Sequence, residues 1–395
     1  MGRQPTRDRS EWTAVSVLPN VELETSIDGN LAALTPCEDA RVLSLTNAYL
    51  NLREFLARFS DAFGVRLNPS VLLVRSDAPQ RFFTVGAIAS FRDAIALSVV
   101  PYNRAAELVY PRGHRISFSH SFWLYPWMVD RNNEYLIANT PALLALHEVS
   151  EFHGQSSPEM SHMRLGQSDV DQPLLRLLLS RWQRCYGTSR PLWPDIALFR
   201  SLNMAYQASQ LPAGADTTFY DVGRLIALWV SAFEILAHPG EGRSGLFAVY
   251  DLLDRVAWEH QRSKVRRYAA YEANRRTAGR RRIANRIYGE IYQARNDFLH
   301  GNPVSPRRLT IRSSGRSLFN YAAPLYRLAL TGFLPLSWNR PSPPMENSEE
   351  VGRYLAEHME FVEPQRLIER ALHTMFVRPE DASPDNRRRR LRSAT

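Results

Sequence analysis

The sequence predicts an α+β domain followed by an all-α helical bundle and an arginine-rich tail. Short β-rich runs set among turn residues occupy positions 65 to 170, and long amphipathic helices begin after Pro173. At 395 residues the chain is long enough for two domains that each bury a core. We therefore expect an N-terminal domain at 1–170 and a helical domain at 171–335. A proline-rich linker, a helix and the tail follow at 336–395.

The first half of the chain carries the strand signals. The apolar runs Val71–Val74 and Phe82–Val85 favour strands. A turn-rich tetrad separates Phe122–Met128 from Tyr135–Asn139, so these two segments are expected to form a hairpin. Leu143–His147 is expected to be a short helix. This half resembles no family that we can name, and a sensory or regulatory role for it stays open.

Beyond Pro173 the apolar residues recur at helical spacing. Thr217 or Thr218 can cap one strong helix at its start, whereas Gly301 and Pro303 can terminate another. Residues 335–346 contain four prolines and are expected to be extended. The expected helices are Leu174–Cys185, Ile196–Ala208, Tyr220–Ala237, Leu246–His260, Ile283–Leu299, Leu318–Phe333 and Ser348–Phe376.

Composition and charge restrict the class of protein. A net charge of +9 suits a polyanionic partner such as nucleic acid. Lys264 is the only lysine among the 49 basic residues, which indicates a coding bias and weakens the charge as a sign of RNA binding. The two cysteines are too few for a disulfide scaffold, and the polar N-terminus lacks a signal-peptide core. We expect a cytoplasmic protein without a membrane span.

One short segment carries the chemistry. Arg295 stands five positions before His300, at the expected end of a helix, and Gly301 follows. Five residues of a regular helix rotate by roughly 140°, so these two side chains converge only if the last turn tightens or unwinds. The pair therefore requires a helix terminus.

The arrangement of Arg295, the polar Asn296, three variable residues and then His300-Gly301 resembles the HEPN superfamily. The apolar helix that contains Glu234 and the helix that begins near Tyr321 resemble the family as well. The similarity is closest to the Apea-like HEPN branch, and it covers roughly residues 200 to 335.

This resemblance implies a metal-independent endoribonuclease that acts as a homodimer and uses no cofactor. His300 would move protons, and Arg295 would clamp the phosphate. Asn296 would either orient the imidazole or bind a phosphate oxygen. RNA supplies its own 2′-hydroxyl nucleophile, so the products would be a 2′,3′-cyclic phosphate and a 5′-hydroxyl. The family also implies a bacterial stress response or antiviral defence, with an unknown trigger acting on the N-terminal domain.

Two further features accompany the motif. Glu234 lies in an apolar helix, where an unpaired carboxylate is costly to bury, so a partner such as Arg295 is expected and a structural role is favoured. Ten basic residues lie between positions 262 and 286 and lead into the motif helix. They form either a solvated surface or an RNA track. The RNA-binding candidates are Arg280, Arg281, Arg282 and Arg286.

Two alternatives remain open. The helical domain could be a non-catalytic module that binds RNA or a nucleotide and dimerises, or the activity could reside in the N-terminal half. The histidines show no ligand spacing with cysteines or carboxylates, so no metal site is expected.

Overall fold

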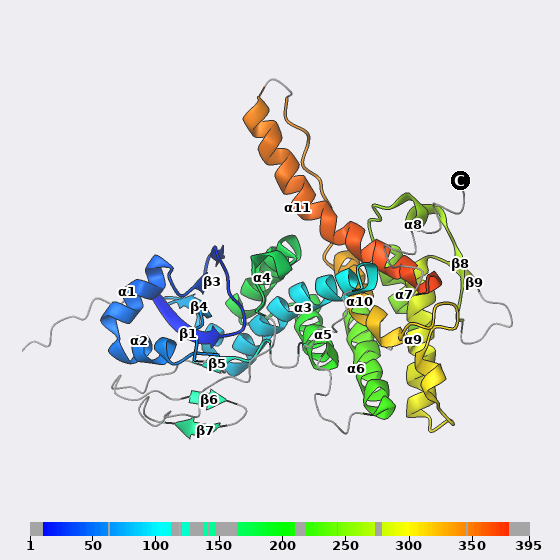
Figure 1. Ribbon diagram of the computed structural model, residues 1–395, viewed down its shortest axis with the longest axis horizontal. Helices are drawn as coiled ribbons and strands as arrows, with labels where there is room; N and C mark the ends of the chain where they lie inside the picture. The colour runs from blue at the N-terminus through cyan, green and yellow to red at the C-terminus, as the bar shows by residue number, and fades with distance from the viewer. Residues whose placement is uncertain are drawn as a thin grey trace, which may run out of the picture. The chain divides into compact units, whose positions relative to one another are not determined.

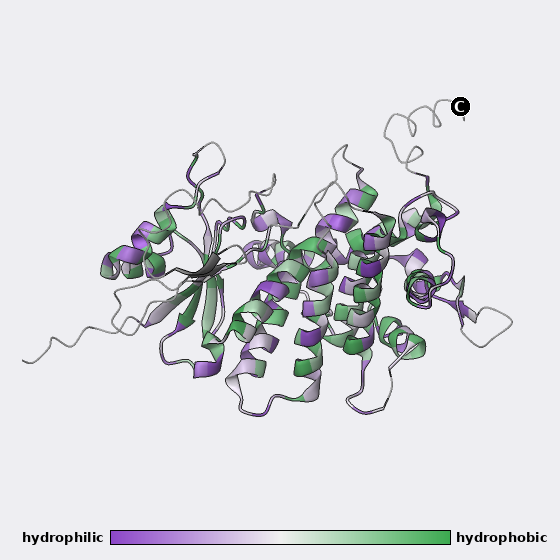
Figure 2. Cartoon of the chain, turned by 90° about the horizontal axis from the view of Figure 1, so that it is seen from below, coloured by the Kyte–Doolittle hydropathy of each residue, from purple (hydrophilic) through white to green (hydrophobic). Residues whose placement is uncertain are grey.

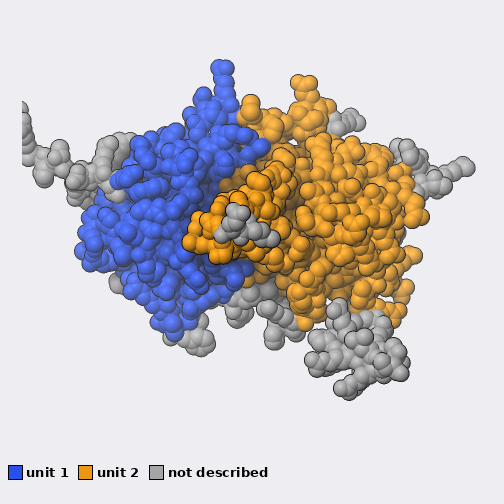
Figure 3. All heavy atoms as spheres, turned by 90° about the horizontal axis from the view of Figure 1, so that it is seen from above, with its two compact units in different colours: residues 1–92, 118–168, 179–191 blue, residues 93–117, 169–178, 192–395 orange. Residues whose placement is uncertain are grey.

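A computed structural model describes residues 11–61, 64–111, 118, 121–126, 138–140, 143–146, 164–209, 218–242, 244–272, 279–344 and 347–378. The chain divides into two compact units (Figure 3). Unit 1 comprises residues 1–92, 118–168 and 179–191, and unit 2 comprises 93–117, 169–178 and 192–395. The units interleave along the chain because two helices, α3 (Val85–Val109) and α4 (Gln172–Gly187), each begin in one unit and end in the other. The sequence predicts a single boundary at residue 170.

Unit 1 is built on a five-stranded antiparallel sheet with the order β2-β3-β4-β1-β5 (Figure 1). A bulge shifts the register of β1 against β4 between Ala14 and Ser16. The expected strand at Val71–Val74 is confirmed as the buried part of β4. The strands are β1 (Trp12–Leu18), β2 (Ile27–Asp28), β3 (Ala32–Pro36), β4 (Ser70–Arg75) and β5 (Tyr125–Pro126).

Two short helices, α1 (Ala40–Ala48) and α2 (Leu50–Ala57), supply apolar side chains to this sheet. Leu52 of α2 is fully buried in the same cluster as Val17 and Val71 of the strands. The carboxylate of Asp39 caps α1 by accepting a hydrogen bond from the backbone N–H of Arg41 at 2.9 Å. Unit 1 therefore has its own apolar core.

Two predictions for unit 1 are wrong. Phe82 lies in a 3₁₀ helix, η1 (Gln80–Phe83), and not in a strand, because its ring packs edge-on against Trp182 at 4.9 Å. Tertiary packing outweighs its strand propensity. Leu143–Leu146 forms a strand, β7, paired with β6 (Ala138–Thr140), where a helix was expected. The turn of the expected hairpin lies outside the described residues, and the described ends β5 and β6 pair with β1 and β7.

Unit 2 is mostly helical, as expected, and apart from α7 and the short α8, which was not expected, its helices from α4 onward match the expected bounds to within about four residues. Figure 2 shows apolar and polar residues mixed along the helices, which is typical of amphipathic elements. Residues 336–344 of the linker form neither helix nor strand, as expected. The helices are α5 (Trp193–Ser209), α6 (Phe219–Ala237), α7 (Leu246–Asp254), α8 (Gln261–Val265), α9 (Ile283–Leu299), α10 (Ala322–Phe333) and α11 (Ser348–His373), with 3₁₀ turns η5 (Leu318–Tyr321) before α10 and η6 (Thr374–Phe376) after α11.

The helix α7 ends earlier than the sequence predicts. It stops at Asp254 instead of continuing to His260. The backbone N–H groups of Glu259 and His260 instead donate to the carboxylate of Glu369 on α11, at 2.7 and 2.8 Å. Because Glu369 is fully buried, these bonds satisfy a charge that helix continuation would leave with only Gln365 as a donor.

The start of α6 and the end of α9 are formed as their sequences predict. Thr218 and Asp221 form a capping box at the start of α6. At the end of α9 the N–H of Asn302 bonds to the carbonyl of Asp297 at 3.2 Å, and Gly301 adopts a φ of 69°. This is a Schellman motif, which favours glycine at its left-handed position.

The helices α6 and α9 pack closely. A Cβ placed on Gly223 of α6 would lie 2.3 Å from the ring of Phe298 on α9, so glycine permits this approach. Further along, the ring of Phe233 packs against Tyr288 at 5.0 Å and against Tyr326 of α10 at 5.3 Å. These contacts hold α9 against α6 in both its N-terminal and its C-terminal half.

A buried polar network joins three parts of unit 2. Arg327 on α10 and Asp171 before α4 form an ion pair at 2.9 Å, with side chains 2% and 1% exposed. Arg327 also donates to Gln365 on α11, and Gln365 donates to Glu369 at 3.0 Å. Asp171 in addition caps α4 by accepting from the N–H of Leu174 at 3.3 Å. The network thus connects the start of α4 with α10 and α11.

One helix, α3, is long and apolar enough to cross a membrane by length and composition. Its most apolar window is 67% buried inside the protein, as in the core helix of a soluble protein. Its burial within the fold accounts for its apolar character.

The variant Arg327→Leu should lose about 3 to 5 kcal/mol of unfolding free energy, because it leaves the buried carboxylate of Asp171 without its cation. Urea denaturation measures the loss. The double variant Arg327→Leu/Asp171→Leu removes both charges and should recover a large part of it. A double variant no more stable than the single one would contradict this reading of the pair.

Candidate functional site

The motif residue Arg295 and Glu234 meet between α9 and α6. The Nη2 group of Arg295 donates to Oε2 of Glu234 at 2.8 Å. The two side chains are 19% and 21% exposed, so the pair is neither buried nor fully solvated. The cation expected beside Glu234 is therefore Arg295, and the pair fixes one edge of the guanidinium.

Two neighbours on α9 complete the setting of this arginine. Its Nη1 group donates to Oδ1 of Asn296 at 3.0 Å, and its Cζ lies 5.0 Å from the ring centroid of Tyr292. Guanidinium carries five N–H groups in a rigid fork, and these two bonds use two of them. The remaining N–H groups are the kind of donor that binds a phosphate in a bidentate manner.

Burial makes this site electrostatically sensitive. Desolvation raises the pKa of Glu234 above its ordinary value, and the charge and hydrogen bond of Arg295 oppose part of that rise. The hydroxyl of Tyr288 is fully buried nearby, and burial together with the charge of Glu234 raises its pKa well above the ordinary value. Tyr288 therefore stays neutral at physiological pH.

His300 occupies a different position. It is the exposed C-cap of α9, and its N–H bonds to the carbonyl of Asn296 at 2.9 Å, so the helical ladder continues to the last residue. The last turn neither unwinds nor tightens. Regular geometry over five residues keeps His300 and Arg295 roughly 140° apart around the helix axis. Among the described residues, none forms a hydrogen bond or an ion pair with the imidazole.

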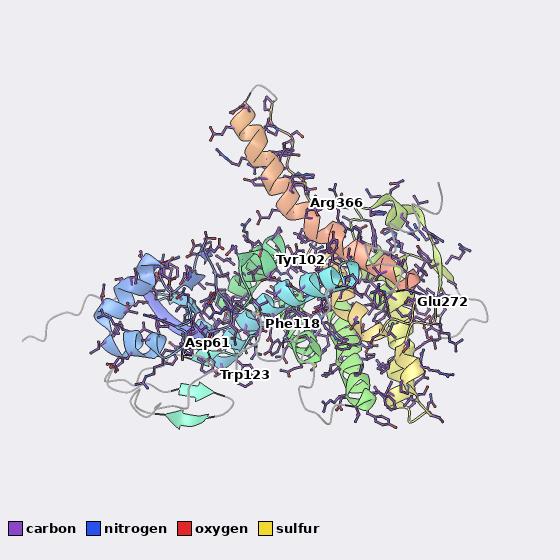
Figure 4. The ribbon with its side chains drawn as sticks, viewed as in Figure 1. Asp61, Tyr102, Phe118, Trp123, Glu272 and Arg366 are labelled. Carbon is purple, nitrogen blue, oxygen red and sulfur yellow. The ribbon has the colours of Figure 1, made fainter. Side chains whose placement is uncertain are left out.

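The basic segment before α9 contains a small antiparallel ribbon that was not predicted, formed by β8 (Tyr268–Ala270) and β9 (Gly279–Arg281). Arg281 lies between Asp254 and Glu272 at 3.5 and 3.6 Å and over the ring of Tyr250 (Glu272 is labelled in Figure 4). Arg282 donates to the carbonyl of Asp254 at 3.1 Å.

The other two RNA-binding candidates, Arg286 and Arg280, differ in their partners and in their exposure. Arg286 pairs with Glu290 at 3.0 Å and donates to the carbonyl of Ala269. Arg280 is exposed and donates to the carbonyl of Arg267 at 3.2 Å. Internal partners thus hold all four candidate arginines, and Arg280 presents the most solvent-facing charge of the set.

A cavity that sequence reasoning did not find lies along another face of α9. Its volume is about 1010 Å³. One wall is a row of α9 residues at helical spacing, Arg286, Glu290, Gln293 and Asp297, and the opposite wall is the segment 303–313. The polar row on α9 can be identified in the sequence, but only the fold places the segment that faces it.

Among the described residues, no group of three or more His, Cys, Asp or Glu side chains is arranged to hold a metal ion. Comparison with models of known families, with curated proteins and with solved structures found no match to this chain.

Because burial raises the pKa of Glu234, the folded protein binds more protons than the unfolded chain just above the ordinary glutamate pKa. Stability therefore falls as pH rises through that window, up to the folded pKa. The variant Glu234→Gln should remove this part of the slope in urea denaturation at a series of pH values. Glu241→Gln, which removes an exposed carboxylate, serves as the control. Identical slopes for wild type and Glu234→Gln would refute the assignment.

Proposed function

We propose that this chain is an endoribonuclease that cleaves RNA by attack of the 2′-hydroxyl, with Arg295, Asn296 and His300 in the catalytic site. The observation that carries the proposal is the Glu234–Arg295–Asn296 arrangement at the end of α9, with an exposed histidine capping the same helix. The resemblance of this segment to HEPN proteins supports the same conclusion.

The chemistry suits these groups. As the RNA 2′-oxygen bonds to phosphorus, its proton is released, and the bond from phosphorus to the 5′-oxygen breaks as that oxygen takes up a proton. His300 moves one of these protons, since imidazole is the side chain best suited to do so near neutral pH. Arg295 stabilises the charge that accumulates on the non-bridging oxygens. Glu234 is a positioning residue, because it acts through Arg295.

The separation of Arg295 from His300 around the helix favours a site made by two copies of the chain. A single α9 directs these side chains to different sides, as its regular end requires. A second copy would bring another arginine and another histidine to the same phosphate. The proposed enzyme is therefore a homodimer, and the N-terminal half would regulate it in response to a trigger, as in a cytoplasmic defence or stress-response protein.

Incubation of the purified protein with total RNA in excess EDTA tests the proposal. Wild type should produce cyclic-phosphate and 5′-hydroxyl ends and leave DNA of the same sequence intact. His300→Ala should lower the rate by about 10² to 10⁴-fold, the usual contribution of a proton-transfer group. His238→Ala, which removes the histidine that caps α6, is the matched control and should retain activity.

Arg295→Lys keeps the charge but loses the planar fork, so it should lower the cleavage rate by about tenfold or more while the protein stays folded. Circular dichroism and thermal unfolding check the fold of each variant. If the wild type binds RNA but produces no new RNA ends, the site belongs to a non-catalytic binding module. Cleavage by His300→Ala at the wild-type rate would remove the catalytic assignment.

A further inference from the structure

The cavity beside α9 has the composition of a nucleotide-binding pocket. Four arginines and two carboxylates line it, which leaves an excess of positive charge. Its inner side is apolar, with Leu318 and Met375 each 2% exposed and Ile311 9% exposed. A base with a phosphate attached has the matching character, since it is flat and apolar at one end and anionic at the other.

The carboxylates of the cavity neutralise only part of its charge. Arg286 pairs with Glu290 at 3.0 Å, and Arg308 pairs with Asp297. Both acidic groups are therefore already engaged by arginines.

Two arginines remain available to a ligand. Arg307 and Arg312 have exposed side chains, and neither forms an ion pair or a side-chain hydrogen bond with any residue that the structure describes. Because these guanidinium groups have no internal ion pair to break, they can bind phosphate oxygens of a ligand in the cavity directly.

An aromatic ring lies at the same cavity. Phe376 in η6 is 38% exposed and lines the cavity, while one side of its ring stacks on Tyr268 at 5.1 Å and an interplanar angle of 15°. Arg266 lies over the ring of Tyr268 at 5.4 Å. A base that stacked on the open surface of Phe376 would extend this column, and such stacking accepts any base.

The cavity also lies in line with the proposed catalytic site. The row that forms its wall recurs at helical spacing along α9, and His300 follows Asp297 by three residues, which continues the same row. A nucleotide in the cavity would therefore lie along the face of α9 that ends at His300.

We propose that this cavity is a subsite for one nucleotide of a single-stranded RNA, with Arg307 and Arg312 on the phosphate and Phe376 under the base. The inference rests on the proposed ribonuclease function, because it places the substrate beside His300. The cavity is a binding site separate from the basic ribbon β8–β9. Of the four RNA-binding candidates from the sequence, only Arg286 of α9 also lines the cavity.

Binding is measured separately from cleavage, by fluorescence anisotropy of a 5′-labelled 12-nucleotide RNA of mixed sequence. All proteins carry His300→Ala, so that the RNA stays intact. The added double substitution Arg307→Gln/Arg312→Gln should weaken binding by about tenfold or more, because each charged hydrogen bond contributes substantially. It should also reduce the magnitude of the slope of log K against the logarithm of the salt concentration by about one, because one phosphate contact is lost. Phe376→Leu should weaken binding severalfold without changing the salt dependence.

The matched control is Arg190→Gln/Arg255→Gln, which removes the same charge from exposed positions outside the cavity. An equal loss of affinity in the control and the cavity variant would overturn the subsite, since only net charge would then matter. AMP binding that depends on Arg307 and Arg312, with RNA binding unchanged, would assign the cavity to a free nucleotide and also overturn it.

The two proposals fail in different ways. Cleavage lost in His300→Ala together with unchanged RNA binding in Arg307→Gln/Arg312→Gln removes the subsite and keeps the nuclease. Cavity-dependent RNA binding by a wild type that makes no new RNA ends removes the nuclease and keeps the subsite.

Discussion

The buried pair of Arg327 and Asp171 is the constraint on which the helical unit depends. Two charges whose side chains are 2% and 1% exposed are costly to bury unless each has its partner. Satisfying them requires the start of α4, the middle of α10 and Gln365 of α11 to meet at one point. Glu369 extends the same requirement to the chain after α7, whose backbone turns to donate to it. Polar groups as well as apolar packing therefore set the arrangement of the helices that support α9.

The site at the end of α9 inherits its geometry from this frame. The close approach at Gly223 and the aromatic contacts of Phe233 hold α9 against α6, so Glu234 can reach Arg295. That pair orients one edge of the guanidinium and leaves its other donors for a ligand. The imidazole of His300 at the helix end forms no hydrogen bond or ion pair with the part of the chain that the structure describes, and the residue is exposed. One half of the motif is thus rigidly held, whereas the other is presented outward.

Two faces of α9 consequently differ in character. The face toward α6 is engaged by Glu234, and its arginine is oriented by internal contacts. The other face forms one wall of the cavity. Arg307 and Arg312 line the opposite wall and belong to the segment that follows α9. In the proposed enzyme the cavity face of α9 positions the substrate, and the face toward α6 carries the arginine that stabilises the reacting phosphate.

The sequence by itself determined the helical character of unit 2, most helix bounds, the cap at Thr218, the glycine terminator at Gly301 and the need of Glu234 for a cation. Caps and helical periodicity act within a few residues, and the cost of burying a lone carboxylate follows from the apolar residues around it in the same helix. Only the tertiary structure decided that Phe82 enters a 3₁₀ helix, that α7 stops at Asp254 and that the units interleave. It also decided that Arg307 and Arg312 face α9 across a cavity. Each of these depends on partners distant in sequence, such as Trp182 or Glu369, which no local pattern specifies.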